Sequence, residues 1–113
     1  MVDRIAYKVL RAAEWEEFER DGVFRGSPVD RADGFIHLSS GPQVTETVDK
    51  HFSGLTDLVL VVVDLARVGD AVRWEPSRGG AFFPHIHGVL PREAVVSAGP
   101  LERTGHGLVK LPG

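Results

Sequence analysis

Two histidines spaced one residue apart, His85 and His87, stand in the stretch "PHIHG". A β-strand rises about 3.3 Å per residue, so a strand here puts both imidazoles on one face with their Cα atoms about 6.6 Å apart. Such a pair can chelate a metal ion, contact a substrate or face solvent. A catalytic zinc ion usually takes three protein ligands, and the sequence offers His37, Glu75 or Asp33 as the third without a spacing that selects one. We therefore expect no bound metal, and a metal-dependent hydrolase built on the two histidines stays an alternative.

A second group with chemical potential lies in "GFIHLSS". Alternation along a strand puts Ile36 and Leu38 on one face, and His37 with Ser39 on the other. The strand leads toward a predicted helix, whose N-terminal N–H groups and positive dipole attract anions. This placement makes His37 a candidate catalytic residue and Ser39 a candidate ligand contact. The alternative is a histidine that hydrogen-bonds to nearby backbone for structural reasons.

Three further side chains are candidates for the same site. Glu75 is a candidate general base or ribose acceptor, although a surface ion pair with a nearby arginine is the common fate of such a residue. Arg78 precedes two glycines and can present its guanidinium to a phosphate from a mobile turn, or remain solvated. Tyr7, in the first predicted strand, is either an aromatic at the edge of the core or a platform on which a ligand stacks.

Composition and missing motifs exclude several classes of protein. The chain has a net charge of −3, a pI near 5.9 and no run of Lys or Arg, which argues against duplex DNA as a partner. It has no cysteine, so it has no disulfide and no thiolate nucleophile. A Gly-rich phosphate loop ending in Lys-Ser or Lys-Thr, a Gly-x-Ser-x-Gly elbow and a His-Glu-x-x-His helix are all absent.

The opening "MVDRIAYKVL" lacks the basic and then apolar layout of a signal peptide, and "LVLVVV" is far shorter than the roughly 20 residues that cross a bilayer. We therefore expect a cytoplasmic protein without a membrane segment.

The 113 residues suffice for a single domain, 1–113, with one core. The run "DLVLVVVDL" is apolar at nearly every position and predicts a central strand buried on both faces. The segment 22–34 is rich in Gly, Pro and Asp and is typical of a loop, long enough to act as a lid. About six short strands and two helices are predicted, at 12–22 and around 40–54, which is an α+β pattern.

Four stretches together resemble a known family: "YKVL" with the Trp that follows, "DGFIHLSS", "LVLVVVDL" and "RWEPSRGGAFFPHIHGVLP". The resemblance runs from Tyr7 to about Val96 and is to a widespread bacterial and plant family catalogued only as a domain of unknown function. That family is grouped with the ADP-ribosyltransferase-like folds, and the order of elements is similar to that of the RNA 2'-phosphotransferases. The matching positions are His37, Leu38 and Ser39, followed by the strand that ends at Asp64.

The resemblance implies two small mixed or antiparallel sheets around a cleft that holds NAD or another ADP-ribose-bearing ligand. It also has departures, because the phosphotransferases begin with a His-Gly-Thr-type strand where this chain has Tyr7-Lys8-Val9, and they carry a basic region that this chain lacks. The RNA-repair activity is therefore not carried over.

Two hypotheses follow: a small transferase or hydrolase acting on NAD or an ADP-ribosylated molecule, or a non-catalytic module that binds a nucleotide-like ligand or a protein partner. Four cationic or titratable groups are expected to line one cleft that favours a pyrophosphate: His37, Arg78, His85 and His87.

Overall fold

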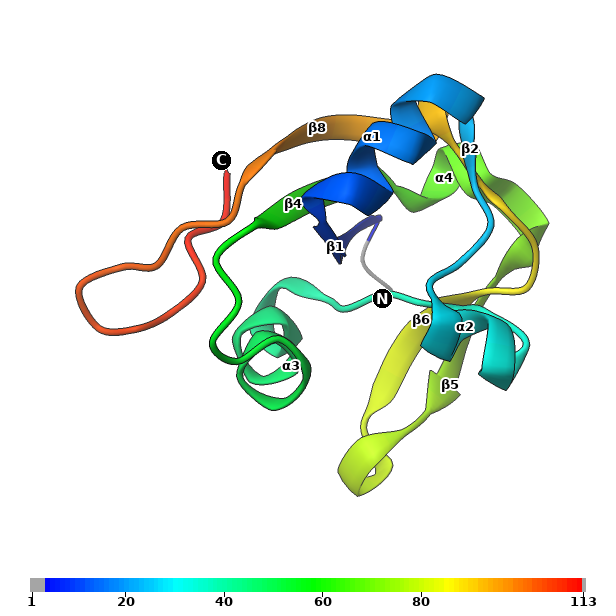
Figure 1. The fold of residues 1–113 in the computed structure, drawn as a ribbon. Coiled ribbons are helices and arrows are strands. Elements are labelled where there is room, and N and C mark those ends of the chain that lie inside the picture. The colour runs from blue at the N-terminus through cyan, green and yellow to red at the C-terminus, as the bar shows by residue number, and fades with distance from the viewer. Residues whose placement is uncertain (1–3, 113) are drawn as a thin grey trace.

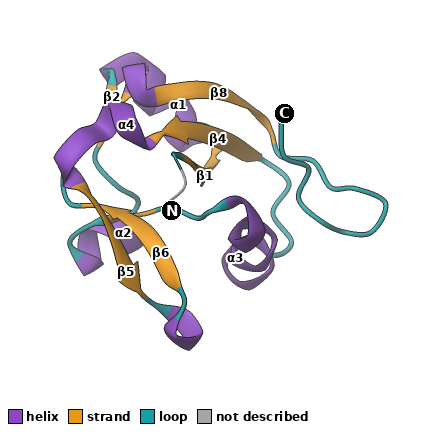
Figure 2. Ribbon diagram, turned by 180° about the vertical axis from the view of Figure 1, so that it is seen from behind, coloured by secondary structure: helices purple, strands orange, loops and turns teal. Residues whose placement is uncertain are grey.

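The structure, a computed structural model, describes residues 4–112 and all of their side chains except that of Arg78. Its strands are β1 (Ile5–Arg11), β2 (Val23–Phe24), β3 (Ile36–His37), β4 (Leu58–Asp64), β5 (Val72–Pro76), β6 (Phe82–Ile86), β7 (Leu90–Pro91) and β8 (Val95–Pro100), and its α-helices are α1 (Ala12–Asp21), α2 (Pro28–Asp33), α3 (Val44–His51) and α4 (Leu65–Val68). The described strands form three antiparallel sheets, with orders β1-β4-β8, β3-β6-β5 and β2-β7. Figure 1 shows the β5–β6 hairpin at the opposite end of the molecule from α1, and Figure 2 shows the same arrangement from behind. The predicted α+β class is confirmed.

Strand β4 is the centre of the first sheet, as its apolar run predicts. Val61 and Val63 are completely buried on one face, in the larger core cluster. Leu58 and Leu60 are buried on the other face, in a second cluster that includes Val44 of α3. Because both faces of β4 are covered, a polar residue in either row would have no access to water.

The loop predicted for 22–34 is wrong, because this segment folds into β2 and α2. Ser27 caps α2: its Oγ accepts a hydrogen bond from the Asp30 N–H at 3.2 Å, and its own N–H donates to Asp30 Oδ2 at 2.9 Å. Pro28 fills the first helical position, and Gly34 ends the helix with a φ of 88°. This reciprocal cap satisfies N–H groups that would otherwise lack partners, and so it stabilises a helix of only six residues.

The predicted numbers of elements are too low. Within residues 4–112 there are eight strands and four α-helices instead of about six and two. The additional strands β2 and β7 have two residues each, and the additional helices α2 and α4 have six and four. Elements this short have no hydrophobic period to detect. No helix in the described range has the length and apolar character needed to span a membrane.

The sheet β3-β6-β5 presents most of the candidate side chains on one face. His37 of β3 pairs with His85 of β6, which in turn pairs with Arg73 of β5. A bridge between Tyr7 and Ser39 joins this region to β1, with backbone N–H···O distances of 2.8 and 2.9 Å. The bridge fixes the position of the chain just before the 3₁₀ turn Gly41–Gln43 that leads into α3.

Candidate functional site

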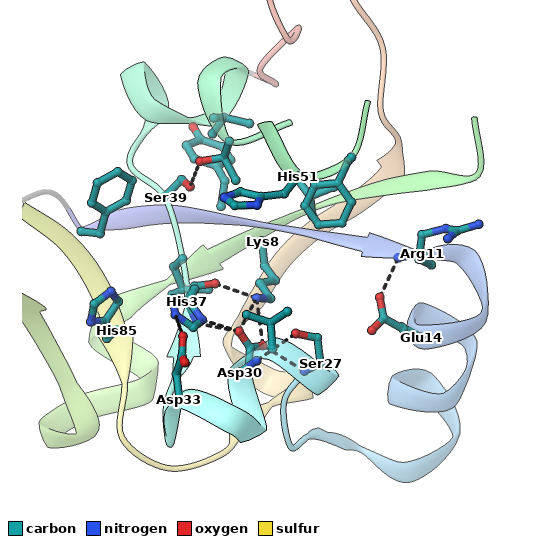
Figure 3. Close-up of a pocket in the computed structure, with 18 of the residues that line it drawn as sticks. Lys8, Arg11, Glu14, Ser27, Asp30, Asp33, His37, Ser39, His51 and His85 are labelled. Atoms are coloured by element: carbon teal, nitrogen blue, oxygen red, sulfur yellow. Dashed lines mark hydrogen bonds and ion pairs between the residues drawn. The ribbon is translucent and has the colours of Figure 1, made fainter. Parts of the chain in front are cut away.

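A cavity of about 560 Å³ lies among β1, α2, β3 and α3. Its wall is largely apolar, with contributions that include Val9, Leu38, Phe52 and Phe83. Figure 3 shows Lys8, Asp30, His37 and Ser27 gathered on one side of it, and Ser39 and His51 on the other. A mainly apolar cavity of this size with a few convergent polar groups is typical of a small-molecule site.

Asp30 is the most heavily bonded group of the cavity, and only 2% of its side chain is exposed. Lys8 Nζ lies 2.9 Å from its Oδ2 and also donates to the His37 carbonyl oxygen at 2.8 Å. The His37 N–H donates to Asp30 Oδ1 at 3.1 Å, and the Ser27 N–H donates to Oδ2. Burial alone raises the pKa of Asp30, but hydrogen bonding with His37, the charge of Lys8 and the Ser27 N–H together hold that pKa well below its ordinary value.

Lys8 is buried together with Asp30, with 9% of its side chain exposed. Burial lowers the pKa of its ammonium group, and the charge of Asp30 and their hydrogen bond oppose that shift. The two charges therefore compensate each other inside the protein, and each would be costly to bury alone.

The His37 ring is held between two carboxylates. Its Nδ1 lies 2.6 Å from Asp30 Oδ1, and its Nε2 lies 2.9 Å from Asp33 Oδ2. Asp30 is buried, whereas the Asp33 side chain is 49% exposed at the end of α2. A carboxylate fixed against Nδ1 sets the orientation of an imidazole and favours the catalytic use of its Nε2. The half-exposed Asp33 carboxylate is accessible to solvent, which can replace it at His37 Nε2.

Ser39 and Tyr7, which were predicted as ligand contacts, line the same cavity. Ser39 is buried, and its Oγ lies 3.0 Å from Thr47 Oγ1 of α3, where either hydroxyl can donate. Tyr7 is half-buried and packs against the smaller core cluster. Both roles that the sequence left open for Tyr7 are therefore compatible with its position at the edge of core and cavity.

Glu75, His85 and His87 form a second group on the face of the β5–β6 hairpin. One oxygen, Glu75 Oε1, lies 2.8 Å from His85 Nδ1 and 2.8 Å from His87 Nε2. The Phe35 ring stacks on His85 with a centroid distance of 4.2 Å. Hydrogen bonds with His87 and His85 lower the pKa of Glu75 below its ordinary value. Burial lowers the pKa of His85, with the hydrogen bond to Glu75 acting in the opposite direction.

The predicted cleft group of four is assembled in part. His37 and His85 both line the cavity, and their ring centroids are 5.4 Å apart. His87 and Glu75 are not among the described residues that line it, although they lie on the same sheet face. The side chain of Arg78 lies outside the described part of the chain, so its role in phosphate binding stays a prediction.

Three residues that line the cavity were not predicted from sequence, Lys8, Asp30 and His51, and Asp33 was considered only as a third metal ligand. A local sequence pattern could have indicated two of them. Lys8 alternates with Ala6 and Leu10, both completely buried, so the strand pattern places a lysine on a core-facing row. Asp30 stands three residues after Ser27, which is the spacing of a capping box.

The chain is similar to solved structures of one bacterial protein. The crystal structure of protein CC0527 from Caulobacter crescentus is 43% identical to this chain, with a TM-score of 0.85, and the match covers 94% of this chain and 93% of that one. The solution NMR structure of CC0527 matches with 43% identity and a TM-score of 0.80, covering 94% and 91%. A search of curated proteins found no match.

A family model matches residues 9–98, which include the cavity residues from Val9 to His85 and the whole hairpin group. Its description is "Protein of unknown function (DUF952)". The chain belongs to this family.

Proposed function

We propose that this protein has an ADP-ribosyltransferase-like fold, and that its cavity binds NAD or another ADP-ribose-bearing ligand, on which it acts as a cytoplasmic transferase or hydrolase. The observation that carries the proposal is the His37 ring, fixed by the buried carboxylate of Asp30 at the wall of a cavity of about 560 Å³. The chemical identity of the ligand comes from the resemblance of the sequence around His37-Leu38-Ser39.

The position now taken by Asp33 suggests how the ligand is held. The Asp33 carboxylate lies 2.9 Å from His37 Nε2 as an ion pair and is half-exposed, so an oxygen of the ligand can replace it at small cost. A pyrophosphate oxygen would exchange one anionic acceptor for another, and a ribose hydroxyl would use the same nitrogen. His37 would then act as the catalytic acid or base, since it contacts the reacting part of the ligand.

The other residues in and near the cavity have different roles in the proposed site. The Ser39 hydroxyl is placed to contact the ribose, and the Tyr7 ring offers a surface on which a base can stack. Glu75 has a positioning role in this scheme, because it reaches the cavity only through its bond to His85 Nδ1. Lys8 is already bonded to Asp30 and to the His37 carbonyl, so its contribution is to hold the site together.

Calorimetric titration with ADP-ribose tests the binding step. The parent protein should bind one ADP-ribose, and His37→Ala should weaken binding more than about tenfold, as expected for loss of a hydrogen bond to a charged group. The matched control is His106→Ala, which removes an exposed histidine that does not line the cavity. Equal affinities in all three proteins would contradict the proposal.

Incubation with NAD then separates the two functional hypotheses. Release of nicotinamide that depends on His37 supports the enzyme. ADP-ribose binding without nicotinamide release, and without turnover of ADP-ribosylated protein, would instead support the non-catalytic binding module.

A further inference from the structure

The three side chains of the hairpin group converge at one point. The ligand-type atoms of Glu75, His85 and His87 all lie within 4.8 Å of one another. Two of the three separations, those from Glu75 Oε1 to the two imidazole nitrogens, are 2.8 Å. In a tetrahedral zinc site with bonds of about 2.0–2.1 Å, neighbouring ligand atoms lie about 3.3 Å apart. Opening these two separations by about half an ångström would therefore admit an ion.

The backbone itself produces this convergence. Arg73 pairs with His85 and Glu75 pairs with Phe83 in the antiparallel register of β5 and β6, so Glu75 and His85 are diagonal neighbours on the same face. The His87 N–H donates to the Ala71 carbonyl oxygen at 2.8 Å, which extends the ladder and keeps His87 on that face. All three side chains therefore project from hydrogen-bonded backbone, and an ion would not have to order a loop.

The surroundings differ on the two sides of the cluster. His85 is 4% exposed and is covered by the Phe35 ring, whose centroid also lies 5.2 Å from that of His87. Glu75 and His87 are 35% and 32% exposed, so the opposite side opens to solvent. Three protein ligands with one open side leave coordination positions for water or a substrate, which is the arrangement of catalytic metal sites.

We propose that Glu75, His85 and His87 bind a divalent transition-metal ion of the zinc type, with solvent completing its coordination. The two imidazoles supply Nδ1 of His85 and Nε2 of His87, and Glu75 supplies a carboxylate oxygen. The expectation of no bound metal rested on the lack of a selected third ligand, and the register of the hairpin now provides Glu75. The ion site does not depend on the proposed function, because it is argued from the hairpin group alone, although His85 also lines the cavity.

Zinc titration of tag-free, chelator-treated protein tests the site, with calorimetry and elemental analysis as readouts. The parent should bind one zinc ion per chain. Glu75→Gln keeps an oxygen that can accept from both histidines but removes the carboxylate charge, and His87→Ala removes a half-exposed ligand; each should weaken zinc binding more than about 100-fold, beyond the usual effect of a partner that only orients a ligand. Co²⁺ in place of zinc should give the intense visible absorption of a low-coordinate ion.

Three controls keep the result interpretable. Circular dichroism and thermal melting establish that Glu75→Gln and His87→Ala are folded, which their partial exposure favours. His106→Ala should bind zinc as the parent does. His37→Ala locates the ion: zinc binding that is lost in this variant and kept in Glu75→Gln would move the ion to the cavity and overturn the assignment. Absence of stoichiometric zinc in the parent, or unchanged affinity in Glu75→Gln, would overturn it as well.

Discussion

The cavity group around Asp30 and the hairpin group around Glu75 each combine histidine with carboxylate, yet they differ in how the carboxylate is held. Asp30 is 2% exposed and bonded to a buried lysine and two backbone N–H groups, whereas Glu75 is 35% exposed and bonded through one oxygen to two imidazoles. A buried, fully bonded carboxylate fixes the orientation of one histidine. A half-exposed carboxylate shared by two histidines can exchange its hydrogen bonds for a metal ion.

The largest expected effect is on stability, in the cavity group. Asp30→Asn leaves Lys8 as an uncompensated buried charge and should reduce the free energy of unfolding by about 3–5 kcal/mol. Urea unfolding measures this loss. The same substitution three residues later, Asp33→Asn, serves as the control: its half-exposed side chain should cost less than about 1 kcal/mol. Equal losses of stability in the two variants would contradict the conclusion that Asp30 is the buried charge that compensates Lys8.

The stability provided by Asp30 should also depend on pH. Because folding lowers the pKa of Asp30 below its ordinary value of 3.8, its stabilising contribution is fully present above that value and is lost as the pH falls below it, toward the folded-state pKa. The stability gap between parent and Asp30→Asn should therefore be constant near neutral pH and shrink below about pH 4. Unfolding curves measured across this range would contradict the account if the gap stayed constant to the lowest pH at which the parent is folded.

A smaller effect is expected on ligand affinity from the exposed partner of His37. Asp33→Ala frees His37 Nε2 and removes a negative charge from the edge of the cavity, so ADP-ribose should bind about fivefold more tightly, the equivalent of about 1 kcal/mol. Calorimetric titration measures the difference. Weaker binding in this variant would show that Asp33 contacts the ligand directly. It would contradict the proposal that a ligand oxygen takes the place of Asp33 beside His37 Nε2.

The smallest effect is expected on the stability of the hairpin group. Glu75→Gln should melt close to the parent, because the side chain is partly exposed and the amide oxygen can still accept from His85 and His87. Differential scanning calorimetry measures the change. A loss comparable to that of Asp30→Asn would mean that Glu75 is a structural residue and that the contrast between the two groups does not hold.

The elements that the sequence predicts well are those with a long hydrophobic pattern. Strand β4 is apolar at six of its seven positions, and helix α1 has apolar residues at helical spacing. The type and approximate ends of both elements therefore follow from physical chemistry. Helix α2 is fixed by two reciprocal hydrogen bonds between Ser27 and Asp30. Such a cap is difficult to recognise in a sequence segment that is rich in turn-forming residues.

The site was predicted to the extent that alternation along strands determines it. His37 and Ser39, or His85 and His87, share faces because their spacing is two. The pairing of His37 with His85, and the diagonal contact of Glu75 with His85, depend on the register between strands distant in the sequence. The Lys8–Asp30 pair depends in addition on the docking of α2 beside β1, which no local pattern encodes.

The central claim is that the two histidine groups serve different ligands, and the ring nitrogens themselves report on it. Long-range ¹H–¹⁵N NMR spectra of the imidazoles, recorded during titrations with ADP-ribose and separately with zinc, follow His37 and His87 in the same sample. The account predicts that ADP-ribose shifts the His37 nitrogens and leaves those of His87 in place, and that zinc shifts the nitrogens of His85 and His87 and leaves those of His37 in place. Unchanged chemical shifts of the His37 nitrogens in the presence of ADP-ribose would contradict the account. Shifts of the same set of histidines with both ligands would contradict it as well.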